Sequence, residues 1–325
     1  MKRHRLGEFE LIRHLSSKIL QKKTGIVIGI GDDCAVVQVS RKGLVLLTTD
    51  MLVEGVHFRR DWMTLDEIGF KAMRVNISDV AAMGGRPRFA LVSVGLPPGF
   101  LVADADLLFQ GIQIAAGEEG ISLVGGDTNA SHKLIINIVL VGERFRRRVV
   151  TRKGARVGDH IYVTGTLGDS RLGLEALRQG KKKGFKTFIQ RHFLPPSRVR
   201  TGQRLARRHF VHSLIDLSDG LVGDLGHILE ESRVGARVLV DQIPISRGMP
   251  EKAGSLGLDP LQVKLAGGED YELLFTASCP LRVPHNIDGV PVTNIGTILP
   301  QKEGLCLIDK KGHRLRRRFS SFKHF

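Results

Sequence analysis

The alternation of short strand-like segments with longer helix-like segments is the feature that most limits how this chain can fold. Apolar, β-branched runs predict strands, and glycine-rich turns separate them from segments with helical patterning. Thr64-Leu65-Asp66-Glu67 is a capping-box pattern, which predicts a helix that runs to about Met83 and ends at Gly84-Gly85. The alternation predicts an α/β or α+β fold in both halves. We expect strands at 26–39, 44–50, 88–95, 121–125, 133–142, 161–163, 236–240, 271–276 and 304–308, and helices at 64–83, 102–118, 168–179, 197–209 and 221–232.

The length of the chain predicts two domains rather than one. Its 325 residues exceed a typical single domain, and 42% of them are hydrophobic, which is enough for two buried cores. The segment 144–158 is basic and interrupted by glycines, as expected of a connection between domains. We therefore expect an N-terminal domain at residues 1–148 and a C-terminal domain at residues 149–325.

The cysteines and the apolar runs limit where the protein works. Cys34, Cys279 and Cys306 lie far apart and form no CxxC pair, which argues against a disulfide framework and against structural zinc. A reducing cytoplasm is the expected location. The basic N-terminal segment lacks the apolar core of a signal peptide, and no uncharged apolar run is long enough to span a bilayer, so we expect no membrane association.

The formal net charge of +16 raises the alternative of a nucleic-acid-binding protein. Basic residues cluster at 146–148, 181–183, 207–208 and 314–318. No aromatic residues interleave with these clusters, and no nucleic-acid-binding motif accompanies them. We therefore interpret the clusters as solvated surfaces and loops, some of which favour the approach of anionic substrates, and nucleic acid is not the expected partner.

Two common phosphate-binding motifs are excluded. The segment 29–34 begins like the dinucleotide-binding GxGxxG pattern, but Cys34 replaces the third glycine, and Asp32 and Asp33 stand where a pyrophosphate needs neutral amides. The segment 180–187 imitates a P-loop, but Phe185 replaces the glycine before the lysine.

A different pattern is present, in which short apolar strands end in acidic residues beside glycine. Carboxylates and hydroxyls are hard oxygen ligands that suit Mg²⁺, and adjacent glycines let the backbone approach a phosphate chain. Metal ions that bridge phosphates neutralise charge when ATP meets a phosphorylated acceptor. The pattern therefore predicts an ATP-dependent phosphotransferase that uses several magnesium ions. The segments are Gly29-Ile30-Gly31-Asp32-Asp33, Thr48-Thr49-Asp50, Gly125-Gly126-Asp127-Thr128, Ile215-Asp216-Leu217-Ser218-Asp219-Gly220 and Gly267-Gly268-Glu269-Asp270.

Asp79 is the most informative single residue, because it lies inside a predicted helix among mostly apolar neighbours. A buried carboxylate needs a partner, and the structural alternative to a metal is that Asp79 caps the backbone or forms a local salt bridge, for example with Lys71 or Arg74. The acidic turns elsewhere favour the metal. Each turn alone has an ordinary explanation too, since Ser218-Asp219-Gly220 could cap the helix that follows and His57 by itself is typical of a half-buried histidine.

Segments along nearly the full chain carry a resemblance to a known family. They are GIGDDCAVV at 29–37, TTDMLVEGVHF at 48–58, KAMRVNISDVAAMGG at 71–85, GGDT at 125–128, TRKGARVGDHIYVTGTLGDS at 151–170, IDLSDGLVGDLGHI at 215–228 and LAGGEDYELLF at 265–275. In this order they resemble the thiamine-monophosphate kinase family, of the superfamily of aminoimidazole ribonucleotide synthetase and selenophosphate synthetase. The resemblance implies direct in-line transfer from ATP to thiamine monophosphate, giving thiamine diphosphate and ADP without a covalent nucleophile.

The resemblance also implies the residues of the site. Among these residues, the aromatic ring of Phe322 would lie beside the cationic thiazolium and act as a cation–π partner. The implied magnesium ligands are Asp33, Thr48, Thr49, Asp50, Asp79, Asp127, Asp216 and Asp219. The implied ATP contacts are Gly126, Asp127, Arg152 and Ser218, and the implied contacts to thiamine monophosphate are His57, Glu269 and Phe322.

Finally, the resemblance implies a homodimer. Its N-terminal mixed sheets would form a dimer-shared β-barrel-like core, and the C-terminal α/β layer domain would cover the cleft. One departure concerns adenine, because Glu118-Glu119 stands where the family pattern has an aromatic residue. The alternatives are selenophosphate or purine synthesis by a relative, nucleic-acid binding, and a non-catalytic magnesium–nucleotide sensor. Against selenium chemistry, Cys34 is the only cysteine in the early glycine-rich region, and it follows the acidic pair directly.

Overall fold

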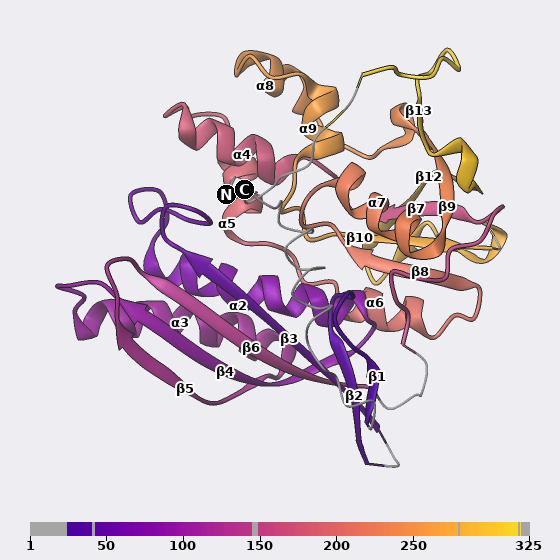
Figure 1. The fold of residues 1–325 in the computed structure, drawn as a ribbon. Coiled ribbons are helices and arrows are strands. Elements are labelled where there is room, and N and C mark those ends of the chain that lie inside the picture. Colours follow the sequence, from indigo (N-terminus) through magenta and orange to yellow (C-terminus); the bar gives the residue numbers. More distant parts are fainter. Residues whose placement is uncertain (1–24, 41–42, 145–148, 279, 318, 320–325) are drawn as a thin grey trace, which may run out of the picture.

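The computed structural model of the chain describes residues 25–40, 43–144, 149–278, 280–317 and 319. Each half of the chain builds one mixed sheet, and helices lie against both sheets (Figure 1). The expected two-part α/β architecture is confirmed. No helix among these residues combines the length and the apolar character that crossing a membrane requires.

The N-terminal sheet has six strands in the order β1-β2-β3-β6-β4-β5. Only β4 and β5 pair in parallel, while the other neighbours are antiparallel. This order and these directions differ from a dinucleotide-binding sheet, in agreement with the failed GxGxxG motif. The strands are β1 (Ile26–Ile28), β2 (Ala35–Ser40), β3 (Gly43–Val53), β4 (Arg86–Leu96), β5 (Ser122–Ala130) and β6 (Ile135–Arg144).

Helices α2 (Leu65–Ala82) and α3 (Val102–Glu119) cover one face of this sheet. The side chains that point to the helices, such as Leu46 and Ile138, are fully buried. The two helices approach closely because glycines face the neighbouring backbone. A Cβ at Gly69 would lie 2.0 Å from the Leu108 carbonyl oxygen, and one at Gly111 would lie 1.8 Å from that of Asp66. The expected helix at 64–83 is confirmed, and its capping box forms with the Thr64 amide donating to the Glu67 carboxylate.

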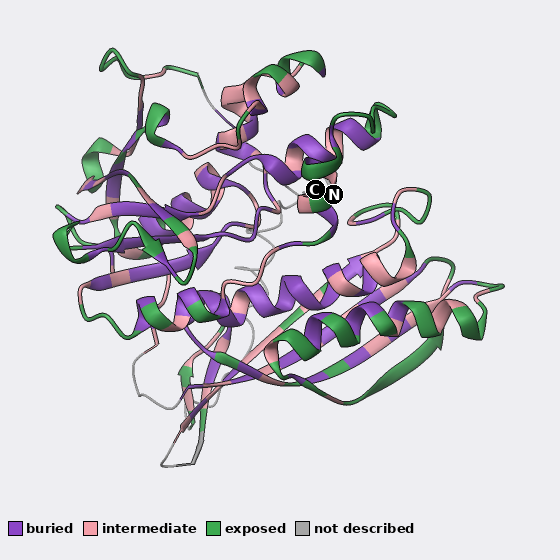
Figure 2. Cartoon of the chain, turned by 180° about the vertical axis from the view of Figure 1, so that it is seen from behind, coloured by how far each residue is buried: buried purple, intermediate pink, exposed green. Residues whose placement is uncertain are grey.

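The opposite face of the N-terminal sheet is open. Met51, Phe89 and Leu91 point away from the helices and are 54%, 44% and 40% exposed, and the edge strand β5 is exposed over most of its length (Figure 2). The sheet of a single chain is therefore open and does not close into a barrel.

The C-terminal half forms a seven-stranded sheet in the order β13-β9-β12-β7-β10-β8, with β11 paired to β12. Most neighbours are antiparallel, while β13 and β9 are parallel. The strands are β7 (His160–Thr164), β8 (Val211–Asp216), β9 (Val234–Leu239), β10 (Leu273–Ala277), β11 (Asn286–Ile287), β12 (Val290–Pro300) and β13 (Leu305–Ile308). The helices are α4 (Asp169–Arg178), α5 (Lys186–Phe193), α6 (Val199–Ala206), α7 (Leu221–Ser232), α8 (Met249–Ser255) and α9 (Pro260–Ala266).

Helix α2 joins the two halves. One side of it packs on β3 and β6, while the other side contacts α5, α6 and β8 of the C-terminal half. It is therefore buried on nearly all sides (Figure 2). A helix enclosed in this way is expected to be apolar all round. The buried polar side chains of α2 consequently need specific partners, and these partners define the site.

Two expectations about strand ends are wrong. Strand β3 continues to Val53, past Thr48-Thr49-Asp50, and β5 continues to Ala130, past Gly125-Gly126-Asp127. The acidic residues therefore lie within these strands rather than in turns after them, because the ladders to β6 and β4 continue through them.

Candidate active site

The polar residues of α2 reach partners in both halves of the chain. The Thr48 hydroxyl of β3 donates to the Asp79 carboxylate, and the Asn76 side-chain oxygen accepts from the Asp50 amide at 3.0 Å. In the other direction, the Ser78 hydroxyl donates to Asp216 Oδ2 at 2.6 Å, at the end of β8. One helix therefore fixes the carboxylates of the N-terminal sheet relative to those of the C-terminal sheet.

Three carboxylates from different parts of the chain converge at this helix. Oxygens of Asp33, Asp79 and Asp216 lie within 4.8 Å of one another, and Asp50 is close enough to act electrostatically on Asp79. Asp33 and Asp216 are buried, and Asp79 is half-buried. The sequence predicted this convergence from the acidic segments, and the structure brings these residues together.

Burial and mutual repulsion raise the pKa values of the cluster. Burial, followed by the charge of Asp33, raises the pKa of Asp216 to about 7 and that of Asp50 to about 6. Burial, and then the charges of Asp50, Asp216 and Asp33, hold the pKa of Asp79 well above its usual value. Such a group of like charges is unfavourable unless protons or cations neutralise it.

The donor set fits a hard divalent cation. All the converging ligands are oxygens, as Mg²⁺ prefers, and the buried Asp33 Oδ2 has no hydrogen-bond partner among the described residues. An unsatisfied buried carboxylate oxygen is unfavourable by itself, and a bound cation would satisfy it.

Arg152 is the cationic side chain that pairs with this cluster. Its guanidinium lies 2.6 Å from Asp33 Oδ1, and its backbone amide donates to Asp32 Oδ2 at 3.2 Å. Burial nevertheless keeps the pKa of Asp33 raised, and burial with the charge of Asp33 raises the pKa of Asp32 to about 7. Within the described part of the chain, this one arginine therefore leaves the cluster with excess negative charge.

A second acidic group lies at the start of α7. Ligand atoms of Asp219, Asp224 and His227 lie within 4.8 Å of one another. Asp224 Oδ2 accepts from the amides of Asp219 and Gly220 at 3.2 and 3.0 Å, and Gly220 is the N-cap residue. The segment Ser218-Asp219-Gly220 therefore does supply the N-cap of α7, through Gly220 and without a capping side-chain hydrogen bond, while Asp219 also belongs to the acidic group.

A cavity of about 630 Å³ opens beside the main cluster. This volume lies in the range of small-molecule sites. Residues of both halves of the chain line this cavity. Asp50 and Asp79 come from the N-terminal half, and Asp216, Ser218 and Asp219 come from the C-terminal half. The remaining lining residues are Met51, Leu52, Gly55, Val56, His57, Phe58, Arg59, Trp62, Met63, Val75, Arg171, Leu174, Arg178, His192, Gly267, Gly268, Glu269 and Tyr271.

The two substrate residues predicted in the described part of the chain, His57 and Glu269, both line this cavity. His57 Nδ1 accepts from the Val53 amide at 3.0 Å, which orients the ring. The Glu269 carboxylate lies 3.0 Å from Lys71 Nζ and 3.2 Å from His192 Nδ1. Burial alone would raise the pKa of Glu269, but the charges and hydrogen bonds of Lys71 and His192 together outweigh it and hold this pKa below its usual value.

The local salt bridge expected for Asp79 is wrong, because Lys71 and Arg74 both pair with other carboxylates. Lys71 pairs with Glu269, while Arg74 pairs with Glu118 and Glu119 at the end of α3. The Arg74 guanidinium also stacks on the Phe70 ring at 4.9 Å. The pair Glu118-Glu119, which departs from the family pattern, is thus held by a buried arginine.

Thr49, Gly126 and Asp127 do not join the cluster within one chain. Asp127 pairs in register with Ser93, which pairs with Asn137, and these side chains share the open face of the sheet. The Thr49 hydroxyl also points there and donates to Asn137 at 3.1 Å. Gly126 has a packing role, because a Cβ there would lie 1.8 Å from the Val92 carbonyl oxygen.

Some residues of the cavity were missed from the sequence. Trp62 and Tyr271 supply rings, and Arg171 and Arg178 of α4 supply positive charge. Helical spacing on α4 would have placed Arg171 and Arg178 two turns apart on one face, but nothing in the sequence pointed α4 at this cavity. Phe322 lies outside the described residues.

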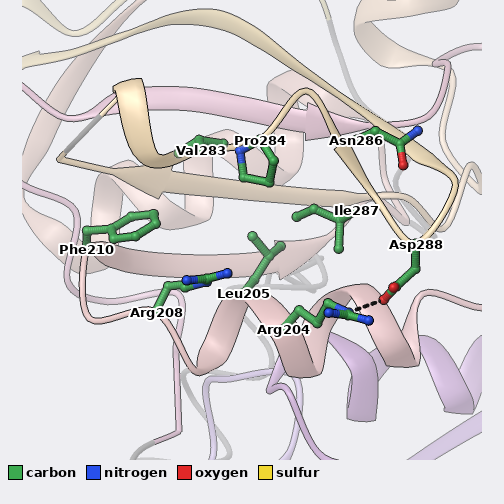
Figure 3. A pocket seen from close by; sticks show the side chains of 9 residues that line it. All are labelled: Arg204, Leu205, Arg208, Phe210, Val283, Pro284, Asn286, Ile287 and Asp288. Atoms are coloured by element: carbon green, nitrogen blue, oxygen red, sulfur yellow. Dashed lines mark hydrogen bonds and ion pairs between the residues drawn. The ribbon is translucent and has the colours of Figure 1, made fainter.

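A second, smaller cavity lies in the C-terminal half, between α6 and the segment 283–288 (Figure 3). Its volume is about 130 Å³, and Arg204 at its rim pairs with Asp288. None of the predicted site residues lines this cavity or a further cavity of about 500 Å³ beside α8, α9 and the segment 309–315, so the large cavity is the candidate active site.

Comparison with known proteins identifies the class first. Residues 31–144 match the N-terminal domain of AIR synthase related proteins, and residues 156–280 match their C-terminal domain. The two-sheet fold is therefore that of an AIR synthase related protein.

Individual relatives narrow this class. Thiamine-monophosphate kinase of Aquifex aeolicus is 41% identical over 280 residues, which cover 85% of this chain and 87% of the relative. Thiamine-monophosphate kinase of Escherichia coli strain K12 is 37% identical over 98% of both chains. The solved structure of AaThiL complexed with AMPPCP and TMP superposes with a TM-score of 0.86 at 36% identity, covering 100% of both chains. The chain belongs to the thiamine-monophosphate kinase family.

Proposed function

We propose that this protein transfers the terminal phosphoryl group of ATP to thiamine monophosphate, giving thiamine diphosphate and ADP. The observation that carries the proposal is the cluster of Asp33, Asp79 and Asp216, which opens into a cavity that also contains Glu269 and Trp62. The cluster suits the phosphate chains, while the carboxylate and the ring suit a cationic heterocycle. The relative crystallised with AMPPCP and TMP supports both substrates.

The carboxylate cluster would hold magnesium. The proposed ligands are the aspartates of the cluster or of the cavity wall, namely Asp33, Asp50, Asp79, Asp216 and Asp219. Bound Mg²⁺ would neutralise the negative charges of ATP and thiamine monophosphate as the two phosphates approach each other. Thr48 orients Asp79, and Ser78 orients Asp216, through the hydrogen bonds described above. These residues therefore preorganise the ligand set before any substrate arrives.

The acceptor would enter from the side of His57 and Glu269. An oxygen of its phosphate attacks the γ-phosphorus of ATP in line and displaces ADP. Because that phosphate is already largely ionised near pH 7, with a second pKa of about 6, no strong general base is needed. Positioning by the cavity and neutralisation of charge would provide the catalysis. Ser218 and Arg152 are the proposed contacts to ATP, and Phe322 stays a proposed wall of the acceptor site.

We also propose the finer organisation of the molecule. Residues 1–148 would form the domain for metal, ATP and dimerisation, and residues 149–325 would complete the cleft. The open apolar face with Met51, Phe89 and Leu91 would meet the same face of a second copy, because a sheet with one uncovered apolar face is incomplete. The two faces would build a shared barrel-like core and would enclose Thr49 and Asp127. A reducing cytoplasm agrees with the buried free thiols of Cys34 and Cys306.

The dimer gives the first prediction. Leu91→Asp places a charge in the proposed shared core, so it should raise the dissociation constant of the dimer at least about a hundredfold. Light scattering coupled to gel filtration should find a dimer for the wild type and a monomer for this variant. Leu281→Asp is the matched control, because Leu281 is 98% exposed in the C-terminal half. A wild-type monomer, or a dimeric Leu91→Asp protein, would refute the shared core.

Product analysis tests the function itself. The protein should form thiamine diphosphate and ADP in equal amounts when ATP, Mg²⁺ and thiamine monophosphate are all present, and none when any one is left out. Parallel reactions with selenide and with purine precursors separate it from the other enzymes of the class. Trp62 is the only tryptophan of the chain, so its fluorescence reports binding without chemistry. Binding without product would instead favour a nucleotide sensor, and salt-dependent binding of nucleic acid alone would favour the basic alternative.

A further inference from the structure

We infer that Lys71 is a positioning residue for the acceptor, because its ammonium group holds the Glu269 carboxylate and the His57 main chain together. The inference rests on the proposed function, which assigns His57 and Glu269 to the thiamine monophosphate site. Lys71 is not among the residues that line the cavity. It would therefore act through the two residues that do.

Lys71 is enclosed completely. Its relative exposure is 0%, its Nζ lies 3.0 Å from Glu269 Oε1, and it donates to the His57 carbonyl oxygen at 3.4 Å. A buried ammonium group is strongly unfavourable unless it has such partners. Lys71 lies on α2 in the N-terminal half, whereas Glu269 belongs to the loop after α9 in the C-terminal half. The pair thus fixes the distance between the two walls of the acceptor site.

The loop that carries Glu269 needs this outside contact. Glu269 and Tyr271 both have left-handed backbone conformations, with φ of 56° and 51°, which non-glycine residues rarely adopt. Their amides donate to the carbonyl oxygens of Ser218 and Leu217 at 2.6 and 2.9 Å, so the main chain is held within the C-terminal half. The direction of the Glu269 carboxylate is set instead by groups outside that loop.

Among the residues that the structure describes, the side chains of Lys71 and His192 contact this carboxylate, and Lys71 does so through an ion pair. His192 Nδ1 lies 3.2 Å from Glu269 and 3.0 Å from the Ser170 hydroxyl. Burial and the charge of Lys71 lower the pKa of His192, so it is neutral near pH 7 and contributes a hydrogen bond. Lys71 therefore supplies the positive charge that both orients Glu269 and limits the net negative charge beside the acceptor phosphate.

The test compares Lys71→Met with Arg144→Met in the full-length protein. Arg144 is the matched control because it is also buried and also joins the two halves, donating to the carbonyl oxygens of Gly84 and Ala206 away from the cavity. We expect Lys71→Met to raise the KM for thiamine monophosphate on the order of 30-fold or more, as the loss of one partner of a buried ion pair does, while the KM for ATP changes less than about threefold. Arg144→Met should lower Tm but leave both KM values near wild type.

A double-mutant cycle with Glu269→Gln separates positioning from general damage. If Lys71 acts through Glu269, Lys71→Met should raise the KM for thiamine monophosphate much less in the Glu269→Gln background than in the wild type. Calorimetric titration of ATP checks that each variant is folded. Equal effects on the two KM values, or additive effects in the cycle, would overturn the inference. Failure of the wild type to phosphorylate thiamine monophosphate would instead overturn the proposed function.

Discussion

Replacing Asp79 with asparagine is expected to lower turnover at saturating magnesium by at least about a hundredfold, which is the size of effect seen when one preorganised electrostatic group is removed. The same change should raise the thermal stability of the magnesium-free protein. Asparagine keeps a side-chain oxygen for the Thr48 hydroxyl but removes one charge from a group in which Asp50, Asp216 and Asp33 repel it. Steady-state kinetics and thermal unfolding at pH 8 measure the two effects.

Asp159→Asn is the matched control for this experiment. Asp159 is a buried aspartate, but its carboxylate accepts from the Arg156 amide and lies 2.8 Å from His212 Nδ1, and it does not line the cavity. We expect this variant to lose stability and to keep its turnover, the reverse of Asp79→Asn. Near-normal turnover of Asp79→Asn would refute the role of Asp79 as a metal ligand, and a loss of stability in that variant would refute electrostatic strain in the cluster.

Removal of magnesium should make the stability of the protein depend strongly on pH. The pKa values of Asp216 and Asp32 are about 7 in the folded protein, against 3.8 for an ordinary aspartate. The folded state therefore binds protons more tightly than the unfolded state, and its stability falls as pH rises through the folded pKa values. Without magnesium, Tm should fall as pH rises from the ordinary aspartate value of 3.8 to the folded values of about 7, and it should level off above about pH 8.

Magnesium should remove most of this fall, because it competes with protons for the same oxygens. An ion present at a hundred times its dissociation constant contributes about 2.7 kcal/mol, which corresponds to a Tm increase on the order of 5 °C. The pH range matters, because His192 and His227 have lowered pKa values and oppose the trend only below their unfolded value of about 6.5. Tm curves with equal slopes in magnesium and in a chelator would contradict a metal site at this cluster.

Much of the fold could be predicted from local patterns. The helix at 64–83 begins with a capping box and ends at two glycines, and both signals lie in the sequence itself. The ends of β3 and β5 could not be predicted, because their ladders continue through polar residues that the neighbouring strand keeps in register. Strand β12 (Val290–Pro300) was missed because its hydrogen bonds come from β7 and β9, which are distant in the sequence.

Some features of the candidate active site could likewise be predicted from the sequence, and others could not. The convergence of Asp33, Asp79 and Asp216 could be anticipated, since Asp33 and Asp216 belong to acidic, glycine-containing segments, and a carboxylate in an apolar helix such as Asp79 needs a partner. The partner of Lys71 could not be predicted, because the sequence of a helix does not reveal which distant loop covers a given side chain. The separation of Asp127 from the cluster depends on which face of an edge strand it occupies, and a bulge after Ala90 in the pairing of β4 with β5 determines that face.

The enclosure of α2 has a consequence for synthesis on the ribosome. This helix emerges early, with Lys71, Ser78 and Asp79 on it, yet Glu269 and Asp216 follow more than a hundred residues later. Until they arrive, the nascent chain carries unpaired charges against a half-built interior, which is unfavourable for compact packing. The first half should therefore remain dependent on chaperones or on loose, solvated conformations during translation, and it should become protease-resistant only after the loop 267–271 has left the exit tunnel.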